Sequence, residues 1–458
     1  MRKKERYKRL LSISLAFIII VIQTLIYAYT WFTSYDGTLP INFFYNGYLV
    51  LIALYALLLL FFSNVYSAYK VGYLRIMDVL YSQFLSIICV NIVTWLQICL
   101  LGYRIMPYMP IVKMTVMDGL AIIAWTFFSH WIYKKLYPAR QLLLIYGNRN
   151  PKHLIHKLNS RSDKYAIHSS VHVNEGEERI KELINQHKAV LVCDINSEIR
   201  NNIVKYCFGK SIRCYIMPKL SDIIIMGSDS IHLFDTPLQL SRNFGLAPEE
   251  KIAKRALDIV ISLLLLIVTS PLMILFSLCI KLYDGGPVFY KQERLTLDGK
   301  TFMIYKFRSM RVDSEKEGAR LAMKNDSRIT PIGNILRKLH LDELPQILNI
   351  LRGEMSVVGP RPERKEIADQ YAKEIEEFPF RLKVKAGLTG YAQVYGKYNT
   401  TPYDKLKLDL YYIQNYNFFL DIKLILLTVK ILFQKENTEG VESWQTTASK
   451  TNEDSNRQ

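Results

Sequence analysis

Two adjacent carboxylates, Asp342 and Glu343, stand among basic residues in a stretch that runs from residue 336 to residue 362. The stretch reads LRKLHLDELPQILNILRGEMSVVGPRP, and its basic residues include Arg337, Lys338, Arg352 and Arg361. Carboxylates among guanidinium groups are typical of sites that handle phosphates and metal ions. An equally simple interpretation makes the charges the solvated side of a helix whose leucines and isoleucines pack inward. Spacing alone does not decide between the two.

The helical spacing of the acid pair restricts its chemistry. Consecutive residues of an α-helix point about 100° apart, so Asp342 and Glu343 cannot flank one scissile bond as the two carboxylates of a glycosidase do. We therefore expect separate tasks, in which one carboxylate attacks a phosphoryl centre and the other helps to hold Mg²⁺; both are candidate metal ligands. The basic residues that we expect to bind substrate phosphates are Arg337, Arg361, and Lys306 and Arg308 of the alternating segment 302–310.

The overall composition indicates a membrane protein that handles anions. Hydrophobic residues make up 50% of the 458 residues, and the formal net charge is +18. We attribute this charge to anionic lipid and phosphates and expect no nucleic acid partner. The six cysteines are scattered without a CxxC pair, and the eight histidines lack the spacing of metal ligands. We therefore expect neither a disulfide framework nor a zinc site.

Four apolar stretches fill residues 1–138, at about 10–31, 48–66, 77–101 and 112–133. Each reaches the roughly 20 residues that a helix needs to cross a bilayer. Lysines and arginines gather before the first stretch and after the second and fourth, which places both ends of this region in the cytoplasm, although Arg104 and Lys113 stand on the other side. We predict a four-helix transmembrane domain that serves as an anchor.

Short apolar runs alternate with polar helical segments between residues 139 and 240. The runs lie at 142–146, 165–171, 189–193 and 212–216, a pattern that predicts βαβ units, a parallel sheet and a Rossmann-like α/β domain. The turn after the first run contains a single glycine, Gly147, which is too few for a pyrophosphate cradle. A regulatory or dimerising role is therefore favoured over dinucleotide binding. Residues 234–250 are interpreted as a linker.

A fifth apolar run, residues 259–282, carries Ser270-Pro271 at its midpoint. Proline removes a backbone donor, so the helix should kink or break there. Basic residues flank both ends, which places both in the cytoplasm. A re-entrant helix hairpin fits both signals, and the Ser270 hydroxyl is a candidate partner for the freed backbone. A proline-kinked crossing is the alternative.

Several rare strings follow residue 250 in a fixed order: KRALD, Ser270-Pro271, PVFYKQER, YKFRSM, LDELPQILN, GEMSVVGPRPE and AGLTGYAQV. By these strings, residues 251–439 resemble the catalytic domain of the bacterial sugar transferases, the monotopic phosphoglycosyl transferases that start capsule, exopolysaccharide or O-antigen assembly. The predicted fold class is thus membrane α plus α/β, with four transmembrane helices, a Rossmann-like module, and an α/β catalytic domain at 241–439 anchored by the re-entrant helix. We expect residues 440–458 to be disordered.

The resemblance also implies a chemistry. The aspartate of the family's Asp-Glu pair, here Asp342, attacks the β-phosphate of a UDP-sugar, releases UMP, and passes the phosphosugar to polyprenyl phosphate. It assigns Glu343 to magnesium or the acceptor, Arg361 to the phosphates, and Ser270-Pro271 to the helix break. The implied substrates are a UDP-hexose and undecaprenyl phosphate, with Mg²⁺ as cofactor, at the cytoplasmic face of the bacterial inner membrane. Glucose and galactose are the leading sugars, and a homodimer is the candidate assembly.

Some features stay open. Thr296 replaces an expected glycine and Ala386 an expected proline, although neither belongs to the acid pair. Segment 403–434 mixes basic and aromatic residues, so it is either a helix in the lipid headgroup layer or a core helix. A non-catalytic membrane scaffold and direct sugar transfer with release of UDP are the alternative functions.

Overall fold

The computed structural model describes residues 7–40, 46–147, 151–159, 161–241, 245–311, 328–396 and 400–432. The chain divides into two compact units, Met1–Met217 and Pro218–Gln458. The tail predicted at 440–458 lies outside the described residues, as do residues 148–150 in the turn after the first predicted strand.

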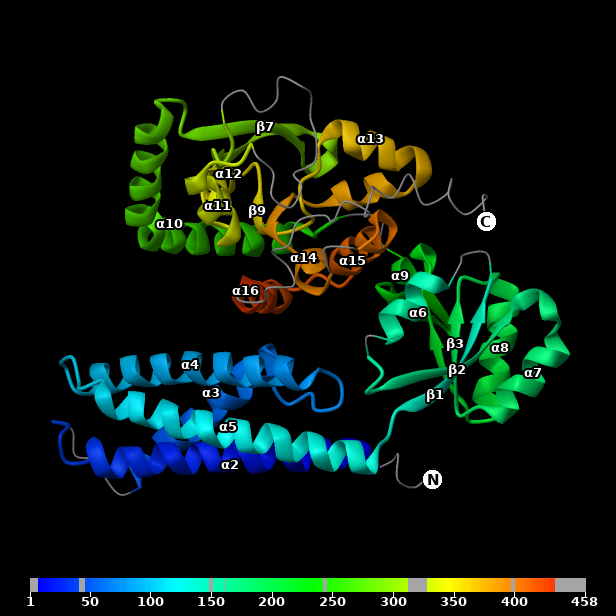
Figure 1. Cartoon of the computed structure of the whole chain (residues 1–458), viewed down its shortest axis with the longest axis horizontal. Helices are drawn as coiled ribbons and strands as arrows, with labels where there is room; N and C mark the ends of the chain where they lie inside the picture. The colour runs from blue at the N-terminus through cyan, green and yellow to red at the C-terminus, as the bar shows by residue number, and fades with distance from the viewer. Residues whose placement is uncertain are drawn as a thin grey trace. The chain divides into compact units, whose positions relative to one another are not determined.

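Four long helices pack side by side in the first unit (Figure 1): α2 (Lys8–Ser34), α3 (Gly47–Val65), α4 (Ile76–Leu101) and α5 (Met109–Leu136). Each is long and apolar enough to cross a membrane. Their exposed surfaces are rich in leucine, isoleucine and phenylalanine, whereas Gln23, Asn91 and Asp118 are buried between them. This polarity is the reverse of that in a bundle surrounded by water, and it suits helices that face lipid.

A four-stranded parallel sheet follows the helices, with strand order β2-β1-β3-β4. Its strands are β1 (Arg140–Tyr146), β2 (Tyr165–His172), β3 (Ala189–Cys193) and β4 (Arg213–Ile216), connected through α6 (Lys152–Asn159), η1 (Val173–Glu175), α7 (Glu177–Gln186) and α8 (Ser197–Gly209). The central strands are apolar because helices cover them, and Leu143, Ile145, Val190 and Val192 lie in their core. The four predicted strands and their parallel pairing are confirmed.

The next segment packs differently from the sequence-based expectation. Helix α9 (Leu220–Met226) contributes Leu220 and Ile223 to the core of the second unit, where it packs on α15 (Pro402–Gln414). Strands β5 (Asp229–Leu233) and β6 (Thr236–Leu240) form an antiparallel hairpin. The first residues of the predicted linker, 234–240, belong to this hairpin. Residues 218–240 therefore belong with the second unit, since the alternation of strands and helices does not reveal which core an amphipathic helix joins.

Helix α10 (Pro248–Asp284) is the long apolar helix of the second unit, and Figure 1 shows that it bends sharply partway along. Pro271 lies inside it and cannot donate to the Ile267 carbonyl, four residues earlier. The Ser270 hydroxyl donates to that same carbonyl at 3.0 Å, and Thr269 donates to the Leu265 carbonyl at 2.7 Å. The predicted role of the serine is confirmed: its side chain replaces the hydrogen bond that proline removes.

The two faces of α10 differ in polarity. Its buried positions include Lys254, Asp258 and Ser262. Its exposed positions are mostly aliphatic on both sides of the proline: Val260, Leu263, Leu264, Ile267, Val268, Ile274, Leu275, Leu278 and Leu282. An exposed apolar surface this continuous is typical of a membrane contact.

The remaining elements of the second unit are small. β7 (Phe289–Leu295) pairs antiparallel with β8 (Thr301–Phe307), and β9 (Ser356–Val358) pairs parallel with β10 (Gly387–Thr389). The other elements are η2 (Leu297–Gly299), α11 (Pro331–Lys338), η3 (Leu341–Glu343), α12 (Gln346–Arg352), α13 (Lys365–Glu374), η4 (Phe378–Lys383), α14 (Tyr391–Tyr395) and α16 (Phe418–Leu432). The alternating segment predicted at 302–310 forms a strand as far as Phe307.

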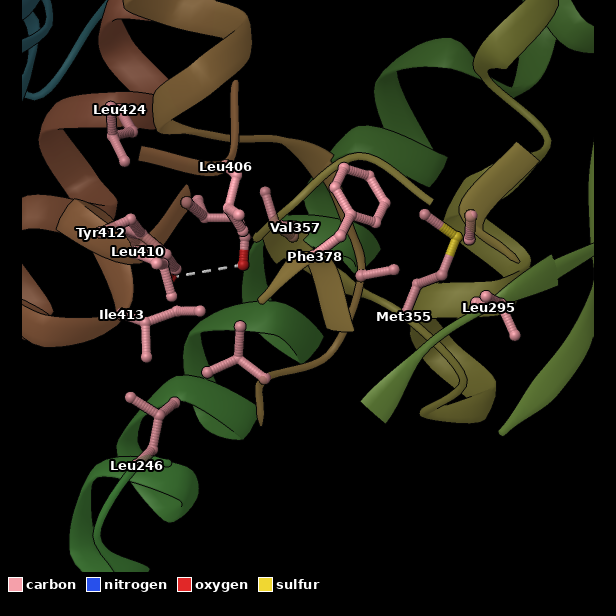
Figure 2. Packing of buried hydrophobic residues seen from close by; sticks show 14 of the residues in the cluster. Leu246, Leu295, Met355, Val357, Phe378, Leu406, Leu410, Tyr412, Ile413 and Leu424 are labelled. Carbon is pink, nitrogen blue, oxygen red and sulfur yellow. Dashed lines mark hydrogen bonds between the residues drawn. The ribbon is translucent and has the colours of Figure 1, made fainter. Parts of the chain in front are cut away.

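The core of this unit gathers side chains from distant parts of the chain. Figure 2 shows Leu246 and Leu295 with Met355, Val357 and Phe378, together with residues of the last two helices. Those helices, α15 and α16, supply Leu406, Leu410, Tyr412, Ile413 and Leu424. The described part of segment 403–434, which ends at residue 432, therefore forms a pair of core helices, one of the two alternatives that the sequence left open.

Candidate active site

The acid pair does not lie on a continuous α-helix, contrary to the prediction. α11 ends at Lys338, His340 takes a left-handed conformation with φ of 54°, and Asp342 and Glu343 form a single 3-10 turn, η3. α12 begins only after Pro345. A left-handed residue breaks the helical repeat and costs backbone energy, which the packing around it must offset. The turn presents each carboxylate at a position that helical spacing did not predict.

Packing against α10 fixes this turn. Leu341 and Leu344, which flank the acid pair, contact a cluster formed by Met273, Ile280, Phe307 and Leu336. Met273 and Ile280 belong to the part of α10 that follows Pro271. The bent apolar helix and the acid pair are therefore parts of one packed structure.

Two cations hold the Glu343 carboxylate. Its Oε1 accepts a hydrogen bond from Lys306 Nζ at 2.7 Å and another from Arg361 Nη2 at 2.8 Å. Burial raises the pKa of the Glu343 carboxyl, but Arg361 and Lys306 outweigh it and hold that pKa well below its usual range. Glu343 is therefore ionised at neutral pH and fixes two phosphate-binding candidates beside the acid pair.

The Asp342 carboxylate has a different environment. Among the described residues it has no hydrogen-bond or ion-pair partner. Burial, and then the neighbouring charge of Glu343, raise the pKa of Asp342, while Lys306, Arg337 and His340 oppose the shift without cancelling it. Asp342 is thus the more basic carboxylate of the pair, and it is the one left available to a substrate.

A rigid turn carries Arg361. Arg381 donates from Nη2 to the Arg361 carbonyl at 3.1 Å, and Arg294 donates from Nη1 to the Pro362 carbonyl at 3.2 Å. A Cβ on Gly359 would lie 2.3 Å from the Lys385 carbonyl, so only glycine allows this close approach to the β10 segment. The guanidinium of Arg361 is half exposed and projects from a fixed backbone.

The other predicted phosphate-binding residues divide into two groups. Arg337, at the end of α11, is near enough to lower the pKa of Asp342. Arg308, itself buried, instead forms an ion pair with the exposed Asp284 at the end of α10, and its side-chain contact among the described residues is there rather than at the acid pair. The structure brings Lys306, Arg337 and Arg361 to the two carboxylates and uses Arg308 to join β8 to the end of α10.

The KRALD string has a clear structural role that its sequence did not disclose. Arg255 donates to the Ile350 and Leu351 carbonyls at 2.6 and 2.7 Å, at the end of α12. Asp258 accepts from Ser356 Oγ at 2.9 Å and from the Val357 amide at 2.8 Å. These residues tie α10 to the strand and helix that support the acid pair. Charged residues next to the apolar part of a helix were the feature of the sequence that could have indicated this structural role.

The two departures from the family pattern contact one another. Thr296 Oγ1 donates to the Glu354 carbonyl at 2.9 Å and accepts from the Ala386 amide at 3.2 Å. A proline at 386 would have no amide to donate, and a glycine at 296 would have no hydroxyl to accept. Each departure therefore supplies the partner that the other needs, and the loop geometry in question is held by this pair.

The described residues contain no group of three or more His, Cys, Asp or Glu side chains that could hold a metal ion by themselves. Mg²⁺ is commonly held by one or two carboxylates together with substrate phosphates. Asp342 and Glu343, adjacent in one turn, fit that smaller donor set, although Glu343 Oε1 is already shared by two cations.

The region that carries the acid pair matches known proteins in sequence. Residues 249–435 match the sequence model of the family described as "Bacterial sugar transferase". A UDP-glucose:undecaprenyl-phosphate glucose-1-phosphate transferase of Escherichia coli K12 is 40% identical over 208 residues, which are 44% of this chain and 43% of that protein. A UDP-N-acetylgalactosamine-undecaprenyl-phosphate N-acetylgalactosaminephosphotransferase of Aeromonas hydrophila is 40% identical over 182 residues, 39% of this chain and 43% of that protein.

The matched region thus spans less than half the length of these two relatives. An uncharacterized sugar transferase of Bacillus subtilis 168, EpsL, is 39% identical over 188 residues, which are 41% of this chain and 91% of that protein. The match covers nearly all of this shorter relative. The family model covers residues 249–435, which include the acid pair and the Arg361 turn. The chain belongs to the bacterial sugar transferase family.

Proposed function

We propose that this protein transfers a hexose-1-phosphate from a UDP-hexose to undecaprenyl phosphate through a covalent intermediate on Asp342. The observation that carries the proposal is the division of the acid pair: Glu343 is held by two cations, while Asp342 beside it has a raised pKa and no partner among the described side chains. The relatives from E. coli and A. hydrophila are named for sugar phosphate transfer to undecaprenyl phosphate.

In the first step, an Asp342 oxygen attacks the β-phosphorus of the UDP-hexose. A phosphorus–oxygen bond forms to the carboxylate, and the bond from that phosphorus to the bridging oxygen breaks, so UMP leaves with the oxygen. The raised pKa favours attack because a more basic carboxylate is a better nucleophile. Lys306, Arg337 and Arg361 are placed to neutralise the phosphate oxygens as charge develops.

Glu343 has a supporting task in this scheme. Its lowered pKa keeps it ionised, so it does not supply a proton at neutral pH. Its two ion pairs, both near 2.7–2.8 Å, hold Lys306 and Arg361 at the acid pair before substrate arrives. Fixed charges need no reorganisation when the reaction occurs.

In the second step, an oxygen of undecaprenyl phosphate attacks the same phosphorus. The bond to Asp342 breaks, the carboxylate is restored, and the lipid leaves with the phosphosugar. The lipid phosphate approaches along α10, because the aliphatic face of that helix is exposed and its second part packs against the turn that carries the acid pair.

Asp342 and Glu343 would hold Mg²⁺ together with the diphosphate of the substrate. When bound, the ion supplies positive charge that stabilises the leaving phosphate. Lys306 and Arg361 supply part of the same charge from the protein.

Helices α2–α5 are proposed to cross the bacterial inner membrane, with α10 as a re-entrant helix and the acid pair on the cytoplasmic side. Length and hydropathy make all five helices candidates to cross. The bend at Pro271 and the basic flanks favour a return to the same side for α10. The parallel-sheet module is proposed to be a Rossmann-like regulatory or dimerising unit, and the homodimer stays a prediction.

The test uses full-length enzyme in nanodiscs with undecaprenyl phosphate and a panel of UDP-hexoses. We expect UMP as the nucleotide product and, without the lipid acceptor, a phosphosugar adduct on a peptide that contains Asp342, detected by mass spectrometry. Release of UDP would indicate direct glycosyl transfer instead. Absence of turnover with every sugar would favour a scaffold.

A further inference from the structure

We propose that a cavity behind the Arg361 turn holds the nucleobase of the nucleoside diphosphate; the inference rests on the proposed function. The cavity has a volume of about 70 Å³. Most of its wall comes from the turn at Pro360 and Arg361, from the face of α13 with Ala368 and Ala372, and from η4 with Phe378 and Leu382. Leu295, Glu363, Val384 and Ala386 complete the lining.

The walls suit a flat ring. Ala368 and Ala372 lie one helical turn apart on α13, so their small side chains leave space along one face of that helix. Phe378 is 3% exposed and belongs to the core, which gives the cavity a fixed floor. Ligand sites of this kind combine apolar walls with a few polar groups that fix orientation.

The volume limits the ligand. A cavity needs on the order of 10–15 Å³ to hold one water molecule, so a cavity of about 70 Å³ admits a group larger than one water. A single pyrimidine base is a compact ring suited to such a space, whereas a whole nucleotide is much larger. A polyprenyl chain would extend far beyond the cavity.

Four charged residues line the cavity, Arg361, Glu363, Asp369 and Arg381. They supply hydrogen-bond donors and acceptors, and uracil offers two carbonyl acceptors and one N–H donor. Arg381 lines the cavity and is 4% exposed. Its Nη2 reaches Asp409 and the Arg361 carbonyl, but its Nε has no partner among the described groups. Asp369 also lines the cavity, on the exposed side of α13, and its carboxylate can accept from a ring N–H.

Arg361 connects the cavity to the acid pair. Arg361 forms part of the cavity wall, and its Nη2 atom lies 2.8 Å from Glu343 Oε1. A nucleotide with its base in the cavity would therefore extend past Arg361 and bring its diphosphate toward Asp342. The leaving UMP and the lipid-bound product would occupy different sides of the site, since the aliphatic face of α10 serves the lipid.

The first experiment needs no substitution. Full-length enzyme in nanodiscs is irradiated with 4-thio-UMP, and the labelled peptides are mapped. We expect label within residues 360–386, with protection by UMP and none by inorganic pyrophosphate, which has no base. Label confined to other segments, or unaffected by UMP, overturns the subsite.

The second experiment fills the cavity. Ala372→Phe occupies the space from α13, and Lys373→Phe places the same side chain on an exposed position of the same helix as a control. We expect UMP to bind at least about tenfold more weakly to A372F and within about twofold of wild type to K373F, with inhibition by pyrophosphate unchanged in both. Unchanged UMP binding by a folded A372F overturns the subsite, and if A372F does not fold, the labelling result decides.

The outcomes separate the subsite from the proposed function. Wild-type turnover with UMP release, but no label in the cavity, would overturn the subsite and leave the function standing. Label in the cavity without any phosphosugar adduct on Asp342 would support the subsite and overturn the covalent mechanism.

Discussion

Two charged clusters of the second unit use the same residue types for different ends. The acid pair sets Glu343 against Lys306 and Arg361, with Asp342 beside them. The second cluster, under α10, sets Asp421 against Lys254 at 2.6 Å and against the Tyr412 hydroxyl at 2.7 Å. The difference lies in how completely each carboxylate is satisfied.

In the cluster under α10, both Asp421 oxygens have partners and the side chain is 1% exposed. Burial raises the pKa of Asp421, and Lys254 and Tyr412 oppose this shift without cancelling it while they occupy the space around the carboxylate. At the acid pair, Glu343 takes both cations and leaves Asp342 with a raised pKa and without a partner among the described residues. A perturbed pKa therefore indicates reactivity only where a substrate can still reach the group.

Substituting asparagine for Asp342 and, separately, for Asp421 should give the largest difference between the two clusters. Asp342→Asn removes the nucleophile, so we expect turnover to fall by roughly 10³-fold or more while the unfolding temperature stays unchanged or rises slightly. UMP release and thermal unfolding of the same preparation measure both. Asp421→Asn is the matched control, which should lower the unfolding temperature more than the turnover of the folded enzyme. Equal loss of turnover in both would remove the distinction between the clusters.

Breaking the buried pair from its other side tests stability. Lys254→Met leaves Asp421 as an uncompensated buried carboxylate, which should cost about 3–5 kcal/mol. Denaturation in nanodiscs measures the loss, and turnover of the remaining folded enzyme should stay near wild type. Adding Asp421→Leu should recover much of the stability, because a charge pair replaced by apolar groups leaves no unpaired charge. If K254M alone abolished turnover without unfolding, Lys254 would belong to the chemistry.

The geometry of Arg361 predicts a smaller loss. Arg361→Lys keeps the charge but loses the forked donor set, a change of about 1.5–3 kcal/mol for hydrogen bonds to charged groups. We expect kcat/KM for the UDP-hexose to fall by about 10- to 100-fold. Arg364→Lys, on the same segment but with no role at the acid pair, should leave the kinetics unchanged. If R361K left kcat/KM unchanged, only the positive charge at position 361 would matter.

The pH dependence sharpens the comparison further. Asp342 must be ionised to attack, and its pKa is raised above the ordinary aspartate value, so activity should fall as pH falls through a range higher than that of an ordinary aspartate. Glu343→Gln removes a charge that raises this pKa and releases Lys306 and Arg361. The acid limb of the residual activity should therefore move to lower pH. A shift to higher pH would contradict the assignment of Asp342.

Much of this architecture was readable from residue patterns. Hydropathy predicted the four helices α2–α5, because the length of a continuous apolar stretch can be read directly from the sequence. Alternation gave the strands of the parallel sheet and β8. The Ser270-Pro271 pair predicted the bend in α10 and the hydroxyl that bonds the carbonyl left without a backbone donor. Each of these features depends on residues that lie close to one another along the chain.

The errors arose where long-range packing decided the outcome. The helix expected through the acid pair is interrupted at His340, and α9 joins the core of the second unit. Arg308 carries the same charge as Lys306 in the same strand segment, yet its ion pair is with Asp284. Neither spacing nor charge distinguishes these two residues, because the partner of each lies more than twenty positions away.

The sequence by itself determined the elements, the family and the two carboxylates at its centre. Only the tertiary structure decided that Glu343 would be held by Lys306 and Arg361 while Asp342 would stay available, and that Thr296 and Ala386 would compensate for one another. The physical reason is that local propensity is set by neighbours along the chain. The pKa and the reactivity of a charged group are set by burial and by charges from other elements, which the fold alone brings together.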